Sequence, residues 1–180
     1  MTSLTGSGPI SFPVDVRRLP QKGFPLVIEP DEKARAALAR AHGLLSVDTF
    51  RAELLLKDWK RGGVGVTGRV QARIVQECVV TLEPIESVID EEIDTLFVPE
   101  GSTLSRETIE DGELVLTSEG PDLPETFDGA SIDAGAVAEE FFGLGIDPYP
   151  RKAGAELPRD GKADAEASPF ARLRDLKRDD

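Results

Sequence analysis

The stretch "FRAELLLKDWKRGGVGVTGRVQARIVQECVV" (residues 50–80) carries the clearest structural pattern in the chain. Apolar and polar residues alternate on both sides of the turn sequence "KRGG" (residues 60–63). This period of two around a glycine-containing turn predicts a β-hairpin with one buried face. The side chains predicted to be buried are Phe50, Ala52, Leu54 and Leu56 in the first arm and Val64, Val66, Val70, Ala72 and Ile74 in the second.

The second arm of this hairpin is long for a single strand. Its apolar alternation continues through Cys78, Val80 and Leu82, whereas strands usually run to about 10 residues at most. We therefore expect a bulge or a break near Gly68 or Gln76.

Helices and further strands are predicted on both sides of the hairpin. "PDEKARAALARAHGL" (residues 30–44) has helix formers between an N-cap, Asp31, and a terminating glycine, Gly43. "IDAGAVAEEFFGLG" (residues 132–145) has apolar residues at helical spacing after Asp133, and Phe141 and Phe142 are expected to anchor this helix. "SVIDEEIDTLFVP" (residues 87–99) and "GELVLTSE" (residues 112–119) indicate two more strands.

Together these elements predict an α+β fold. We expect one domain over residues 1–152, in which an antiparallel sheet of about five to seven strands, open or curled toward a barrel, packs with two α-helices. Residues 153–180 are expected to form a flexible tail with a short terminal amphipathic segment, because "AGAELPRDGKADAEAS" (residues 153–168) is too polar to pack a core.

The formal net charge of −13 is distributed unevenly along the chain. Residues 1–75 carry 12 Lys and Arg against 7 Asp and Glu, whereas residues 76–150 carry 1 against 20. Such asymmetry indicates charged partners rather than a particular fold, although an acidic surface also keeps a small protein soluble.

Cys78 is the only cysteine, and His42 is the only histidine. A tetrahedral zinc site requires four nitrogen or sulfur ligands, and the alternation places Cys78 on the core side. We therefore interpret Cys78 as a core residue, ahead of a reactive thiol or a metal ligand. The sequence shows no nucleophile elbow, phosphate loop or zinc-protease motif, so we expect no catalytic residue, metal or cofactor.

Two segments are candidate binding surfaces, one basic and one acidic. Basic residues and one tryptophan on the polar side and at the turn of the hairpin resemble a nucleic-acid platform, but a solvated sheet face gives the same pattern. These residues are Arg51, Lys57, Trp59, Lys60, Arg61, Arg69 and Arg73. The acidic segment "DEEID" (residues 90–94) would suit a basic protein, a divalent cation or simply solvent. Its carboxylates belong to Asp90, Glu91, Glu92 and Asp94.

A third candidate lies at the end of the chain, in "SPFARLRDLKRD" (residues 168–179). Phe170, Leu173 and Leu176 form an apolar stripe with basic residues around it. This pattern predicts a short recognition helix that orders on a partner or on the acidic part of this protein, and a frayed tail is the alternative.

The segments "QECVVTLEP" (residues 76–84), "IDEEIDTLFVP" (residues 89–99) and "SIDAGAVAEEFFGLGIDPYPRK" (residues 131–152) resemble the YceD-like family of large ribosomal RNA subunit accumulation proteins. The resemblance covers residues 10–155 and the terminal "SPFARLRDLK", which is similar to the alphaproteobacterial branch. Many members have C-x-x-C-L, whereas this chain has Cys78, Thr81 and Leu82. The missing second thiolate argues against a paired metal role.

The resemblance implies a cytoplasmic, non-enzymatic factor that supports biogenesis of the large ribosomal subunit. The expected partners are a basic ribosomal protein, ribosomal RNA or its precursor, or both, and the acidic middle of the chain favours the protein. We expect no membrane and no small-molecule substrate as partner. The alternatives are an enzyme that uses Cys78 or the carboxylate cluster, and a general acidic interaction module.

Overall fold

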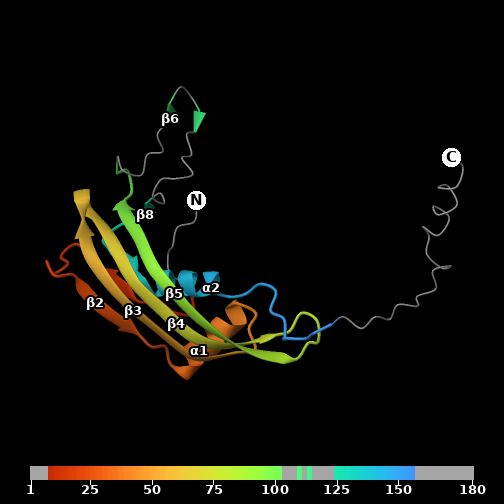
Figure 1. Cartoon of the computed structure of the whole chain (residues 1–180). Coiled ribbons are helices and arrows are strands. Elements are labelled where there is room, and N and C mark those ends of the chain that lie inside the picture. Colours follow the sequence, from red (N-terminus) through yellow and green to blue (C-terminus); the bar gives the residue numbers. More distant parts are fainter. Residues whose placement is uncertain (1–7, 103–108, 111–112, 115–123, 157–180) are drawn as a thin grey trace, which may run out of the picture.

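The computed structural model describes residues 8–102, 109–110, 113–114 and 124–156. These residues form an open five-stranded sheet in the order β2-β3-β4-β5-β8, flanked by two α-helices (Figure 1). The strands are β2 (Phe24–Ile28), β3 (Ser46–Trp59), β4 (Gly63–Glu77), β5 (Pro84–Pro99) and β8 (Glu125–Phe127). Neighbouring strands are antiparallel except β8, which is parallel to β5. The predicted α+β class is confirmed, with a sheet that stays open across the described residues.

Two small antiparallel pairs accompany the main sheet. β1 (Pro13–Asp15) pairs with β9 (Ser131–Asp133), and β6 (Ile109–Glu110) pairs with β7 (Glu113–Leu114). The predicted strand at residues 112–119 is therefore represented among the described residues by β7 alone. The first pair joins the beginning of the domain to the residues that lead into the second helix.

The hairpin predicted from residues 50–80 consists of β3 and β4. Its turn holds a 3-10 helix, η1 (Lys60–Gly62), in which Arg61 has a φ of 56° and Gly62 a φ of 76°. All the residues predicted to be buried on this hairpin are buried. β4 ends at Glu77, as expected near Gln76, whereas the register shift lies in β3 between Val47 and Thr49.

The two helices begin where the sequence predicted. α1 (Glu32–Ala41) begins after Asp31, whose Oδ1 accepts a hydrogen bond from the Ala34 backbone N–H at 2.8 Å. α2 (Ala134–Leu144) begins after Asp133, whose Oδ1 accepts from the backbone N–H groups of Gly135 and Ala136. These caps satisfy N–H groups that have no partner inside the helix.

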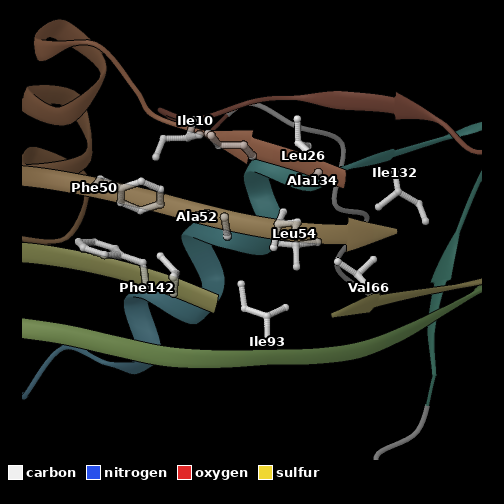
Figure 2. Packing of buried hydrophobic residues seen from close by; sticks show 14 of the residues in the cluster. Ile10, Leu26, Phe50, Ala52, Leu54, Val66, Ile93, Ile132, Ala134 and Phe142 are labelled. Atoms are coloured by element: carbon white, nitrogen blue, oxygen red, sulfur yellow. The ribbon is translucent and has the colours of Figure 1, made fainter. Parts of the chain in front are cut away.

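Both helices pack on the same face of the sheet, which we call the covered face. Phe142 of α2 is fully buried, and its ring centroid lies 5.5 Å from that of Phe50 on β3 (Figure 2). The His42 ring, at the end of α1, lies nearly perpendicular to the Phe142 ring, with the two ring centroids 5.3 Å apart. Phe141 is only partly buried, so the prediction that both phenylalanines anchor α2 holds in full for Phe142 alone.

Candidate functional site

The open face of the sheet, opposite the helices, holds most of the predicted site residues. The register aligns Glu53 of β3 with Arg69 of β4 and Glu92 of β5. The adjacent row aligns Arg51, Gln71 and Asp90 in the same way. The basic and acidic candidates, which lie far apart in the sequence, are therefore neighbours on one surface.

Two of the predicted basic residues form ion pairs with acidic neighbours. Arg51 lies between two carboxylates: its Nε donates to Glu53 Oε1 at 2.8 Å, and its Nη1 contacts Glu29. The hydrogen bonds that Arg51 donates to Glu53 first, and to Glu29 second, raise the pKa of Arg51 above its ordinary value. Arg69 Nη1 lies 3.0 Å from Asp90 Oδ1. The acidic neighbours thus offset part of the positive charge that the sequence assigned to this face.

The remaining basic candidates lie at the turn and on β4. Lys57, Trp59, Lys60 and Arg61, which we call the turn cluster, are all exposed. Lys60 Nζ lies 5.9 Å from the centroid of the Trp59 ring, within the range of a cation–π contact. Arg73 is exposed and forms no ion pair with the residues that the structure describes.

A depression of about 570 Å³ lies on the open face beside the register shift in β3. Three arginines from three elements line it: Arg35 of α1, Arg51 of β3 and Arg73 of β4. Arg35 was not predicted, because its helical position gave no signal that its side chain reaches the sheet. Glu29 and Asp48 also line the depression, so its net charge is small.

The acidic candidates divide between the two faces of β5. Asp90, Glu92 and Asp94 are exposed, and the register places them on the open face. Glu91 faces the other way and is half-buried; its Cγ would lie 2.8 Å from a Cβ added at Gly145. Successive side chains of a strand point to opposite faces, so "DEEID" is not one cluster.

Glu86 shares the exposed side of β5 with these acids and was missed in the sequence analysis. Its parity with Asp90 was the available signal. We call Glu86, Asp90, Glu92 and Asp94 the acidic row. Among the described residues, Asp90 is the one member with an ion pair, to Arg69. The other three carboxylates of the row have no cation paired with them in this part of the chain.

Cys78 is fully buried, as predicted, in the loop between β4 and β5. Its Sγ accepts hydrogen bonds from the backbone N–H groups of Lys152 and Thr81, both at 3.4 Å. These hydrogen bonds lower the pKa of Cys78 to about 6, and the one from the Lys152 N–H has the largest effect, followed by those from Thr81. Across the described part of the chain, no three His, Cys, Asp or Glu side chains are grouped closely enough to hold a metal ion.

The prediction that Leu82 lies on the apolar side is wrong. Leu82 is 68% exposed and has a φ of 60°. The strand ends at Glu77, and a turn closes when the Leu82 N–H donates to the Cys78 carbonyl at 2.9 Å. Strand alternation no longer applies inside such a turn, so the side chain points to solvent.

Two of the segments that carry the family resemblance meet at this loop. The Val79 N–H donates to the Pro150 carbonyl at 3.0 Å, and Lys152 Nζ lies 2.7 Å from Glu83 Oε2. The buried Gln76 side chain donates to the Asp147 carbonyl at 2.8 Å. The segment that follows α2 therefore holds the Cys78 loop in place, which gives these residues a structural role.

The predicted recognition segment with Phe170, Leu173 and Leu176 lies outside the described residues. Its role stays a prediction. The expected flexibility of residues 153–180 is likewise untested.

The family model described as "Large ribosomal RNA subunit accumulation protein YceD" matches residues 66–177 of the chain. Because the match covers more than half of the sequence, the chain belongs to the YceD family. This membership supports a role in the accumulation of large-subunit ribosomal RNA. Neither the curated proteins nor the solved structures contain a match.

The matched region begins inside β4, so it includes the acidic row and excludes the whole turn cluster. Neither helix of the described part has the length and apolar character that a membrane crossing requires.

Proposed function

We propose that this protein is a non-enzymatic factor of large-subunit biogenesis that binds a basic ribosomal protein through the acidic row of β5. The family description names the accumulation of ribosomal RNA and no catalysed reaction. A factor that holds a basic ribosomal protein before or during its incorporation would support that accumulation without contacting the RNA itself.

The observation that carries this proposal is the imbalance of charge on the open face. Arg51 and Arg69 are paired with carboxylates, whereas Glu86, Glu92 and Asp94 form no ion pair with the described residues. Unpaired surface carboxylates steer a basic partner toward the face and repel RNA phosphates.

The Cys78 loop supports the non-enzymatic part of the proposal. The Sγ atom is enclosed, and its hydrogen-bond donors are backbone amides rather than a side chain that could act as a general base. Nucleophilic catalysis requires a thiol that a substrate can reach, and the enclosed Sγ atom is not accessible although its pKa is lowered. The cysteine is better explained as part of the packing between the loop and the segment after α2.

Direct binding of ribosomal RNA through the turn cluster is the second candidate. Trp59 is 38% exposed, and Lys60 lies near its ring. The acidic residues of β5 do not reach the end of the sheet that carries the turn cluster. Lys57 is aligned with Gly65 of β4, and Gly65 is aligned with Leu96 of β5, which is apolar. An exposed aromatic among cations can stack on an unpaired base.

A pull-down from cell lysate, with and without nuclease, separates the two candidates. The proposal expects ribosomal proteins to remain bound after the RNA is digested, and the double variant Glu92→Lys, Asp94→Lys to lose them. The variant Lys60→Glu, Arg61→Glu should keep them. Loss of every ribosomal component on nuclease treatment would instead favour the RNA candidate.

The RNA candidate makes its own quantitative prediction. Each phosphate contact that is removed lowers the log–log slope of affinity against salt by about 0.7–0.9. If the turn cluster binds RNA, Lys60→Glu, Arg61→Glu should flatten this slope in a filter-binding titration with a ribosomal RNA fragment. An unchanged slope would exclude the turn cluster as the RNA site.

A further inference from the structure

Among the residues that the structure describes, most of strand β5 has no neighbouring strand on one of its sides. β4 pairs with β5 along Pro84–Phe97, but on the opposite side β8 pairs only with Phe97, Val98 and Pro99 (Figure 1). No backbone–backbone hydrogen bond from another described segment reaches residues 85–96 on that side. Within the described part of the chain, the sheet therefore ends in a long row of backbone N–H and C=O groups that face outward.

Natural proteins usually block such an edge, because an unpaired strand can pair with another chain. The common devices are a short strand, a proline within it or a β-bulge. β5 has 16 residues, its prolines stand only at its two ends, and its register with β4 continues without a shift from Pro84 to Phe97. None of these three devices protects the edge.

Among the described residues, the charge of β5 is a further protection of this edge, and it is selective. The exposed acids Asp90, Glu92 and Asp94 recur at every second residue, about 6.7 Å apart along the strand. A second copy of β5 would bring like charges together, which opposes pairing. A strand with lysine or arginine at every second residue would instead match the row with opposite charges.

We propose that the free edge of β5 takes up an extended basic segment of a protein partner as an additional strand of the sheet. Backbone hydrogen bonds supply the pairing, and cross-strand contacts with Asp90, Glu92 and Asp94 select basic side chains. The class of partner rests on the proposed function, since that function calls for a basic ribosomal protein. The position and the mode of binding rest on the geometry of β5 alone.

RNA fits this edge less well than a peptide does. The outward backbone groups repeat at the spacing of a second polypeptide strand, and neighbouring strands lie about 4.8 Å apart. A phosphate chain at that distance would meet the acidic row and be repelled. A peptide satisfies the backbone groups and the carboxylates at the same time.

A synthetic peptide of about ten residues with alternating lysine and valine tests the proposal directly on the full-length protein. One control peptide has glutamate in place of lysine. A second keeps the lysines but carries an N-methyl group on every backbone amide, which blocks strand pairing at both edges of the peptide without changing its charge. Affinity is measured at about 0.15 M salt, and amide hydrogen exchange of β5 is followed by NMR.

The proposal expects the lysine peptide to bind and to slow exchange at outward-facing amides within residues 85–96. The glutamate peptide should not bind, and the N-methylated peptide should bind at least about tenfold more weakly. Equal affinity of the methylated peptide, or binding without slower exchange on β5, would overturn strand addition. Absence of binding by the lysine peptide would overturn it as well.

Variants of the protein distinguish the effect of the β5 acids on peptide affinity from the effect of the overall net charge. Glu92→Lys, Asp94→Lys should weaken the lysine peptide by about tenfold or more. Glu32→Lys, Asp128→Lys makes the same change of net charge at exposed positions outside β5, and it should leave the affinity within about twofold. Equal weakening by both variants would mean that only net charge matters and would overturn the proposal.

The lysate experiment then distinguishes binding at the edge of β5 from the proposed function. If nuclease-resistant capture of ribosomal proteins persists in Glu92→Lys, Asp94→Lys, the edge is not their site, although the proposed function stands. If the unmodified protein captures no ribosomal protein while the peptide still binds β5, the edge proposal stands and the proposed function fails.

Discussion

The two faces of strands β3, β4 and β5 arise from one alternating pattern but have different surroundings. On the covered face, side chains such as Ala52, Val66 and Ile93 are fully enclosed (Figure 2). On the open face, Arg69, Asp90 and Glu92 remain in water. Burial of apolar area stabilises a fold, whereas exposed ion pairs contribute little. The comparison teaches that stability depends on the covered face, which leaves the open face of the same strands free to carry charge.

The largest effect is expected from a cavity on the covered face. Phe142→Ala removes a fully buried ring, so it should lower the free energy of unfolding by about 3–5 kcal/mol. Phe141→Ala is the matched control, because Phe141 is only partly buried and should cost less than half as much. A denaturant titration of both variants measures the difference. Equal losses would mean that the two rings contribute alike to the core.

A pair of glycines on β4 gives the next largest difference. A Cβ at Gly68 would lie 2.1 Å from the Glu53 carbonyl oxygen, whereas a Cβ at Gly65 has no other atom within 4 Å. Gly68→Ala should therefore cost about 1–3 kcal/mol, because two paired backbones must separate. Gly65→Ala should stay within about 0.5 kcal/mol of the unsubstituted protein. Thermal unfolding of both variants tests this, and a neutral Gly68→Ala would contradict the close approach of β3 and β4.

The Cys78 loop should make the stability of the protein depend on pH. The pKa of Cys78 in the folded protein is about 6, against an ordinary value of 9.0. The folded state therefore favours the thiolate, and its contribution to stability is complete above pH 9.0 and is lost as the pH falls through about 6. The stability of the unsubstituted protein relative to Cys78→Ala should rise between these two values. A constant difference across this range would contradict the lowered pKa.

The smallest effect is expected from an ion pair of the open face. The Arg69–Asp90 coupling, measured by a double-mutant cycle with Arg69→Gln and Asp90→Asn, should be about 0.2–1 kcal/mol. Both side chains are roughly half exposed, so water and salt screen their attraction. A coupling above about 2 kcal/mol would show that open-face charges help to hold the fold, and it would weaken the division between the two faces.

Several local features were predictable because they depend on residues close together in the sequence. The hairpin, its buried side chains, both helix N-caps and the end of β4 near Gln76 all follow from alternation, capping and turn chemistry. These signals are confirmed by β3, β4, α1 and α2. The burial of Cys78 was predicted in the same way.

The relations between distant segments required the tertiary structure. Alternation shows which side chains share a face of one strand, but not which strand lies beside it. Only the pairing of β4 with β5 placed Asp90 beside Arg69, and only the short pairing with β8 left most of β5 with an edge that no other described strand pairs.

The sequence by itself thus determined the class of fold, the main hairpin, the helix boundaries and the resemblance to the YceD family. The tertiary structure decided that Arg51 and Arg69 are paired with acids and that Leu82 is exposed. It also decided that, among the described strands, only the short β8 lies beyond β5 in the sheet. The physical reason is that propensity and alternation act over a few residues. Strand order and charge compensation arise from contacts between segments that only folding brings together.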